Sequence, residues 1–183
     1  MHINYEFKAK CSNIEKLEQL LKEKKPVFIG LDQQTDTYFN AGSGRLKLRE
    51  GTIENVLIHY ERIDTAAAKK SRVILYQHHP DKHLKEVLTR ALGVKVIVDK
   101  QRKIYFIQNV KFHFDEVNDL GSFVEVEAID RDGSIGVEKL KEQCNQYMQL
   151  FEIRKEQLIA DSYSDLLEKK SSTALAGKFY RNV

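Results

Sequence analysis

The segment at residues 120–129, LGSFVEVEAI, alternates aliphatic side chains with aromatic or acidic ones. A period of two is typical of a β-strand, in which successive side chains point to opposite faces. Phe123, Glu125 and Glu127 would share one face, with the two carboxylates about 6–7 Å apart because a strand rises roughly 3.3 Å per residue. Two carboxylates this close repel each other unless a divalent cation or Lys and Arg side chains lie between them. The segment therefore predicts a strand face that needs cations.

Suitable cations occur on other segments with the same period. Residues 45–49 read Arg-Leu-Lys-Leu-Arg, so three cations face one way and two leucines the other. Residues 3–10 also have one charged and one apolar face, and Lys100 and Arg102 share a face within residues 94–108. A surface sheet could carry such faces, but a surface usually mixes Lys, Glu, Thr and Ser rather than separating the signs by strand. We therefore expect a charged interior, with the apolar outer faces covered by helices.

The whole chain contains roughly eight segments that read as strands, with few helices between them. Predicted strands lie at residues 3–10, 27–30, 35–39, 45–49, 56–63, 72–77, 94–108 (one strand or two), 110–117 and 120–129. Helices are expected after Ser12 and Asp81 and at about 134–150 and 156–169, followed by an irregular or loosely docked tail. An antiparallel sheet that closes on itself can hold a charged interior without exposed edges. The prediction is a mainly β (α+β) fold: a closed eight-stranded antiparallel β-barrel with flanking helices.

Bulk properties limit the class of protein. The 183 residues, 42% hydrophobic and 31% charged, suit one soluble globular domain. A net charge of only +3 argues against a strongly basic nucleic-acid binder. No stretch approaches the ~20 apolar residues of a membrane helix, and the N-terminus has no signal-peptide pattern. Cys11 and Cys144 lack metal-ligand spacing, so we expect reduced thiols in a cytoplasmic protein that contacts neither nucleic acid nor membrane.

A series of short motifs runs through the chain in a fixed order. They are NYEFK at residues 4–8, DTYF at 36–39, RLKLRE at 45–50, YER at 60–62, KQR at 100–102, DEV at 115–117, LG at 120–121, FVEVE at 123–127 and YSDLL at 163–167. Their order and spacing resemble the CYTH superfamily, which covers class IV adenylate cyclases and thiamine triphosphatases among the triphosphate tunnel metalloenzymes. The first motif resembles the family's ExExK signature, with Asn4 in place of the first Glu. The resemblance implies a CYTH domain over residues 1–169 and a C-terminal tail at 170–183.

The resemblance also implies roles for individual residues. The family's barrel, called a triphosphate tunnel, binds phosphates through interior cations and a divalent metal through carboxylates. The implied ligands of Mg²⁺ or Mn²⁺ are Glu6, Asp115, Glu125 and Glu127. The implied substrate-binding residues are Lys8, Lys10, Arg45, Lys47, Arg49, Arg62, Lys100 and Arg102, and the implied catalytic residues are Lys8, Arg49, Glu125 and Glu127. These residue types suit the task, because a triphosphate needs both Lys or Arg and a metal for its neutralisation, and Mg²⁺ and Mn²⁺ favour oxygen ligands.

Three functions remain open at this point. The first is a metal-dependent enzyme on a nucleoside or organic triphosphate, similar to class IV adenylate cyclases, which convert ATP to cyclic AMP and pyrophosphate. The second is a triphosphatase, because the same tunnel could serve both reactions. The third is a non-catalytic binding protein for a nucleotide or polyphosphate, since Asn4 lacks the charge of a carboxylate. A homodimer is also left open.

Some of these residues have a purely structural interpretation as well. Glu125 and Glu127 could form salt bridges with Arg49 or Lys47 that contribute only to stability. His113 is expected to be a packed or hydrogen-bonded strand histidine rather than a catalytic base.

Overall fold

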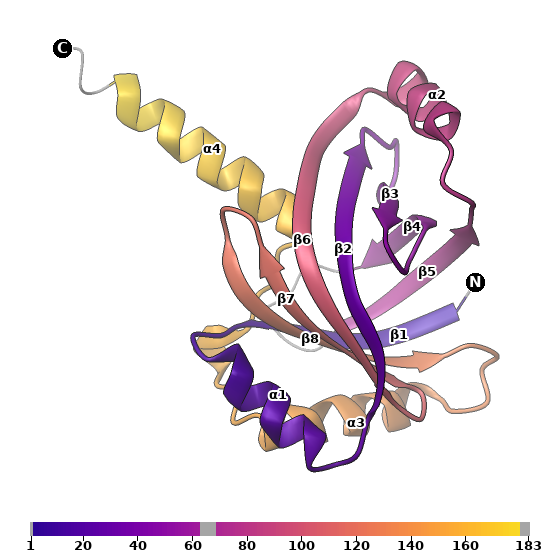
Figure 1. Ribbon diagram of the computed structural model, residues 1–183, viewed down its shortest axis with the longest axis vertical. Helices are drawn as coiled ribbons and strands as arrows, with labels where there is room; N and C mark the ends of the chain where they lie inside the picture. Colours follow the sequence, from indigo (N-terminus) through magenta and orange to yellow (C-terminus); the bar gives the residue numbers. More distant parts are fainter. Residues whose placement is uncertain (1, 63–68, 180–183) are drawn as a thin grey trace.

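Eight strands form one closed barrel in the order β1-β5-β4-β3-β2-β6-β7-β8 (Figure 1). The computed structural model describes residues 2–62 and 69–179; for Arg62 and residues 174–179 it describes the backbone alone. The strands are β1 (His2–Lys10), β2 (Val27–Phe39), β3 (Arg45–Gly51), β4 (Val56–Arg62), β5 (Lys69–Gln77), β6 (Val94–Ile107), β7 (Val110–Val117) and β8 (Gly121–Asp130). Every neighbouring pair is antiparallel. The predicted closed eight-stranded antiparallel barrel is confirmed.

The long strand β2 differs from the sequence-based expectation of separate strands at 27–30 and 35–39. Residues 31–34 pair with β6 throughout, with Asp32 opposite Arg102 and Gln34 opposite Lys100. Asp32 and Gln34 point inward and are buried, at 0% and 2% exposure. The prediction of two strands was wrong because polar side chains on the buried face hid the usual alternation of apolar and polar residues.

The hydrophobic core lies outside the barrel, between the sheet and two helices. Helices α1 (Ile14–Lys22) and α3 (Val137–Leu150) lie against the same side of the barrel (Figure 1). The buried apolar residues of this core include Phe7, Phe112, Val124 and Val126 from the strands, and Leu17, Leu21, Leu140 and Tyr147 from the helices. The strand residues point outward because they alternate with the charged ones. The expectation of a charged interior and apolar outer faces under helices is therefore confirmed for this side of the barrel.

The remaining helices extend beyond the barrel wall. Helix α2 (Lys82–Leu92) follows Asp81, whose side chain accepts a hydrogen bond from the backbone N–H of His83 at 2.8 Å. Helix α4 (Tyr163–Phe179) starts beside the barrel and projects away from it (Figure 1). No helix in the described ranges has both the length and the apolar content needed to cross a membrane.

The C-terminal segment was only partly predicted. A short 3₁₀ turn at Lys155–Gln157 stands where a helix was expected to begin, and α4 continues ten residues past the expected end at 169. The hydroxyls of Ser171 and Ser172 donate to carbonyls one turn earlier, both at 2.9 Å, so these serines remain compatible with a helix. Of the expectation of an irregular or loosely docked tail, the first alternative was wrong for residues 170–179, which are helical, while the domain boundary at 169 stays a prediction.

Candidate functional site

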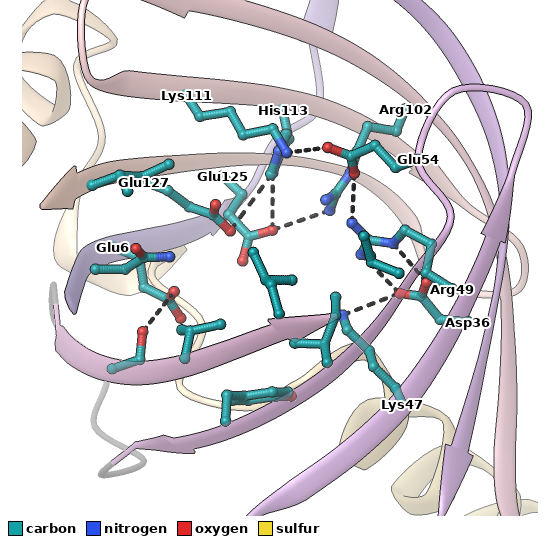
Figure 2. Close-up of a pocket in the computed structure, with 18 of the residues that line it drawn as sticks. Glu6, Asp36, Lys47, Arg49, Glu54, Arg102, Lys111, His113, Glu125 and Glu127 are labelled. Atoms are coloured by element: carbon teal, nitrogen blue, oxygen red, sulfur yellow. Dashed lines mark hydrogen bonds and ion pairs between the residues drawn. The ribbon is translucent and has the colours of Figure 1, made fainter. Parts of the chain in front are cut away.

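The barrel encloses a cavity of about 660 Å³ whose wall is charged on one part and aliphatic on another. Its charged lining residues are Glu6, Lys8, Asp36, Lys47, Arg49, Glu54, Arg102, Lys111, Glu125, Glu127 and Arg131. In Figure 2 Glu125, Glu127 and His113 converge on one side of the cavity, and Asp36, Arg49 and Lys47 lie on the other. The interior therefore has an acidic side and a side rich in cations.

The acidic side is built by three neighbouring strands. Register places Glu6 of β1 opposite Glu127 of β8, and Lys8 opposite Glu125. On the other flank of β8, His113 of β7 lies opposite Glu125. The Nδ1 atom of His113 is 3.4 Å from Glu125 Oε2 and 3.9 Å from Glu127 Oε1. Within the described part of the chain, this is the group of His and carboxylate side chains close enough together to share a metal ion.

The two carboxylates of β8 differ in their electrostatic surroundings. Glu125 is held by Lys8 Nζ at 3.1 Å and by Arg102 Nη2 at 3.1 Å. Burial alone would raise the pKa of Glu125, but Lys8, His113 and Arg102 hold it well below its ordinary value. Burial and the nearby charge of Glu125 raise the pKa of Glu127 to about 7. Glu127 is therefore the carboxylate whose negative charge is least compensated on this side of the cavity.

Two neutral polar side chains complete the acidic side. His113 is 1% exposed, and burial lowers its pKa to about 3, with further lowering by Arg102, so the imidazole is neutral. Asn4 lines the same cavity and is 5% exposed. Among the described residues, Asn4 Oδ1 and His113 Nε2 are buried atoms without a hydrogen-bond partner. Buried polar atoms in native proteins normally have a partner, so Asn4 Oδ1, which belongs to a residue that lines the cavity, has room for a contact to a bound species.

Asp36 of β2 organises three of the predicted cations on the other side. It accepts two hydrogen bonds from Arg49, at 2.8 and 3.0 Å, and lies 3.1 Å from Lys47 Nζ and 2.6 Å from Lys100 Nζ. Against the effect of burial, these cations hold the pKa of Asp36 well below its ordinary value. Lys100 is fully buried behind Asp36 and is absent from the cavity lining. Burial and the neighbouring cations lower the pKa of Lys100 to about 7 despite Asp36.

Glu54 forms a second bridge between cations, and it comes from the turn between β3 and β4. It accepts a hydrogen bond from Arg49 Nη1 at 2.8 Å and contacts Lys111. The turn is held by the buried carboxylate of Asp32, which accepts the backbone N–H groups of Ile53 and Glu54 at 2.8 and 3.0 Å. A Cβ atom at Gly51 would lie 2.7 Å from Asp32 Oδ1, so this close approach requires glycine.

Asp115, an expected metal ligand, instead binds Arg102 and Tyr163 through its carboxylate. Its carboxylate accepts hydrogen bonds from Arg102 Nε at 2.7 Å, from Arg102 Nη2 at 2.5 Å and from the hydroxyl of Tyr163 at 2.7 Å. Asp115 is fully buried and does not line the cavity. It therefore holds the Arg102 guanidinium toward Glu125 rather than joining the acidic side. Tyr163 also lies under Lys8, whose Nζ is 4.0 Å from the ring centroid.

The structure brings together some of the expected substrate-binding residues and separates others. Lys8, Lys47, Arg49 and Arg102 line the cavity. Lys10, at the end of β1, is exposed, and Arg45 pairs with Asp165 of α4 at 2.9 Å; neither lines the cavity. The side chain of Arg62 lies outside the described part of the structure. Alternation predicts which face a side chain takes, but it does not tell how far along the barrel axis the residue lies.

Several residues of this site were not singled out from the sequence. Asp36 was noticed only within the DTYF motif, and Glu54 and Asp32 were not noticed at all. The available signals were the inward period of β2 and the glycine turn before Glu54. Arg49 and Lys47 pair with Asp36, so the suggested salt bridges from these cations to Glu125 and Glu127 are not formed.

The fold and this cavity define a closed barrel with a charged tunnel, and comparison with known proteins identifies its family. The CYTH domain model matches residues 2–163, and the chain belongs to the CYTH family. A Methanocaldococcus jannaschii protein named "Putative adenylate cyclase" is 25% identical over 172 residues, covering 90% of this chain and 98% of that protein.

Solved structures share the fold as well. A protein from Pyrococcus horikoshii OT3 aligns with a TM-score of 0.76 and 23% identity, over 91% of this chain and 99% of that one. A Hippeastrum protein, described as a "putative adenylyl cyclase" with a dominant triphosphatase activity, aligns with a TM-score of 0.56 and 13% identity, over 94% and 96% of the two chains. These identities are low, so the structural likeness is evidence for the fold alone.

Proposed function

We propose that the protein is a metal-dependent enzyme that acts on a nucleoside or organic triphosphate, similar to class IV adenylate cyclases. The observation that carries the proposal is the opposition of carboxylates and cations across one cavity inside the barrel. Membership of the CYTH family and the name of the M. jannaschii relative support it. The two buried, unlinked thiols of Cys11 and Cys144 are consistent with a cytoplasmic protein, which we also propose.

The donor set on the acidic side fits a divalent cation such as Mg²⁺ or Mn²⁺. Glu6, Glu125 and Glu127 offer carboxylate oxygens, and Asn4 offers a buried amide oxygen that has no other partner among the described residues. Oxygen donors of this kind are preferred by both metals. When bound, the metal supplies a Lewis acid that neutralises phosphate charge.

The cations opposite would bind and orient the phosphates. Arg49 and Arg102 present guanidinium groups that can bind phosphate oxygens in a bidentate manner, while Lys8 and Lys47 act as point charges. Asp36 and the other buried anions fix the geometry of these cations before a substrate arrives. Donors held in place in this way stabilise developing charge without a reorganisation cost at the moment of reaction.

The balance of charge argues for a metal together with the triphosphate. Among the described lining residues, six Lys or Arg side chains stand against five Asp or Glu side chains. The protein alone therefore leaves most of the charge of a triphosphate without compensation. A divalent cation that enters with the substrate would supply a large part of the difference.

An organic substituent on the triphosphate is supported by the uncharged part of the wall. Val56 and Ile58 of β4 and Val73 and Leu75 of β5 line the same cavity. Leu75 is 48% exposed although it is aliphatic. Apolar surface beside convergent polar groups is typical of a site for an organic ligand. Inorganic tripolyphosphate would leave this surface in contact with water.

Two reactions are compatible with the cavity, because the bound orientation decides which phosphorus is attacked. In a cyclase the ribose 3′-hydroxyl attacks the α-phosphorus and pyrophosphate leaves. In a triphosphatase water attacks the γ-phosphorus, and this is the second candidate, prompted by the activity described for the Hippeastrum protein. In both, Arg49, Arg102 and Lys8 would hold the phosphoryl oxygens while charge develops on the leaving group.

The test is incubation of the purified protein with Mg²⁺ or Mn²⁺ and with ATP, GTP, thiamine triphosphate or tripolyphosphate. Chromatography distinguishes cyclic nucleotide plus pyrophosphate from diphosphate plus phosphate. Arg49→Gln should abolish turnover, whereas Arg90→Gln on α2, where the side chain is 80% exposed, should not change it. Binding without turnover of any substrate would refute the enzyme and favour the binding protein.

A further inference from the structure

His113 is the nitrogen donor among the carboxylates of the acidic side. It is 1% exposed and stands on β7 directly opposite Glu125. One donor atom each from His113, Glu125 and Glu127 lies within 4.8 Å of the other two. Two ligands of one ion, each about 2.1 Å from it, can be at most roughly 4.2 Å apart. Small side-chain rotations would therefore bring all three donors to one ion.

A separate observation points to a missing partner in the same cavity. Asn4 Oδ1 is buried and unpaired within the described chain, and Asn4 lines the cavity on the same strand face as Glu6. A buried acceptor without a partner carries the cost of its lost hydrogen bonds to water. A bound cation would remove this cost, because an amide oxygen is a competent metal ligand.

We propose that His113 coordinates the metal through Nδ1, and that the site therefore prefers a divalent transition metal such as Mn²⁺ or Co²⁺ to Mg²⁺. The inference rests on the proposed metal site and adds a ligand to it. Imidazole nitrogen suits transition metals, whereas Mg²⁺ demands oxygen ligands in near-ideal octahedral geometry. Exchange of one oxygen donor for nitrogen therefore weakens the binding of Mg²⁺ more than the binding of Mn²⁺ or Co²⁺.

The first measurement is pulsed electron paramagnetic resonance of the Mn²⁺-loaded protein, produced with ¹⁵N-labelled histidine. Directly coordinated imidazole gives a hyperfine coupling to Mn²⁺ that changes with the nitrogen isotope. We expect this coupling in the wild type and its loss in His113→Asp. His59→Asn is the matched control, because His59 lies on the barrel strand β4, contacts Ser43 and does not line the cavity. It should keep the coupling.

The second measurement is calorimetric titration of Mn²⁺ and Mg²⁺ into the same proteins. The wild type should bind Mn²⁺ at least about tenfold more tightly than Mg²⁺, and His113→Asp should narrow this ratio by supplying oxygen instead of nitrogen. His113→Asn serves as a second variant of neutral charge if the aspartate variant does not fold. Thermal unfolding of each variant establishes that the fold is kept.

The outcomes separate this inference from the proposed function. Mn²⁺ binding without a nitrogen coupling, or with a coupling that persists in His113→Asp, overturns the role of His113 and leaves the metal site in place. A persistent coupling would implicate His2, the other histidine that lines the cavity among the described residues. Failure of the wild type to bind either metal overturns both the inference and the metal dependence of the proposed enzyme.

Discussion

Replacement of Glu127 by glutamine should stabilise the metal-free protein at alkaline pH. The pKa of Glu127 is raised from 4.5 to about 7 in the folded protein. Between these values the folded state keeps a proton that the unfolded chain has lost, so the free energy of unfolding falls as the pH rises. The shift corresponds to about 3 kcal/mol, since each pKa unit is worth about 1.4 kcal/mol. Glutamine does not titrate, so the free energy of unfolding of the variant lacks this fall with rising pH.

Urea unfolding of wild type and Glu127→Gln between about pH 5 and pH 8, with a chelator present, measures this difference. Other titrating groups are common to both proteins and cancel when the two curves are subtracted. Glu116→Gln is the control, because Glu116 also lies on a barrel strand, β7, but its side chain is exposed. We expect the control to follow the wild type at every pH.

Addition of Mn²⁺ should reverse the order at pH 8. A ligand that binds only the folded state raises the free energy of unfolding, and glutamine offers the ion a weaker donor than a carboxylate. The wild type should then become the more stable protein. A difference between the two proteins that does not depend on pH, or a metal-free variant less stable than wild type at pH 8, would refute the reasoning.

Other substitutions should act through different contacts. Glu125→Gln should lower the free energy of unfolding by about 3 kcal/mol in urea titrations, because it leaves Lys8 and Arg102 with less compensation in a buried site; unchanged stability would contradict the ion pairs. Gly51→Ala should destabilise by about 1–3 kcal/mol and weaken triphosphate binding, since its Cβ would meet a carboxylate oxygen at 2.7 Å; thermal unfolding and calorimetry check this. Asn4→Glu should tighten Mg²⁺ and Mn²⁺ binding in calorimetric titrations and raise any turnover, because a carboxylate attracts a divalent ion more strongly than an amide; equal or weaker affinity would mean that this side chain does not reach the metal.

The barrel could be predicted because alternation is a local property of each strand. Residues 45–49 and 123–127 show which side chains share a face whatever the partner strand is. Alternation gave no signal at residues 31–34, where Asp32 and Gln34 face inward and the outward Gln33 is polar as well. It also failed after residue 169, where Ser, Thr and Ala gave no clear period although the helix continues to Phe179.

The pairing of charges inside the barrel could not be predicted in the same way. Arg49 reaches Asp36 because β2 and β3 pair in the register that sets these two residues opposite each other. A shift of one residue would turn every side chain of the strand to the other face, so register decides the partners. Glu54 depends on a still more distant contact, since its turn is held by Asp32 of another strand. Neither contact has a signal within a single segment.

The same contacts explain why interior carboxylates with similar sequence surroundings have different expected roles. Asp115 and Asp36 each accept hydrogen bonds from arginine and do not contribute to the acidic side. Glu127 has no Lys or Arg within ion-pair distance in the described chain, and burial together with the charge of Glu125 raises its pKa. Asp36 and Asp115 accept hydrogen bonds from arginines and hold those guanidinium groups in place, whereas Glu127 has no such partner and is the carboxylate that we expect to be most available to a metal ion. The partner strand makes this distinction, and it divides the charged wall of one cavity into an acidic side and a side rich in cations.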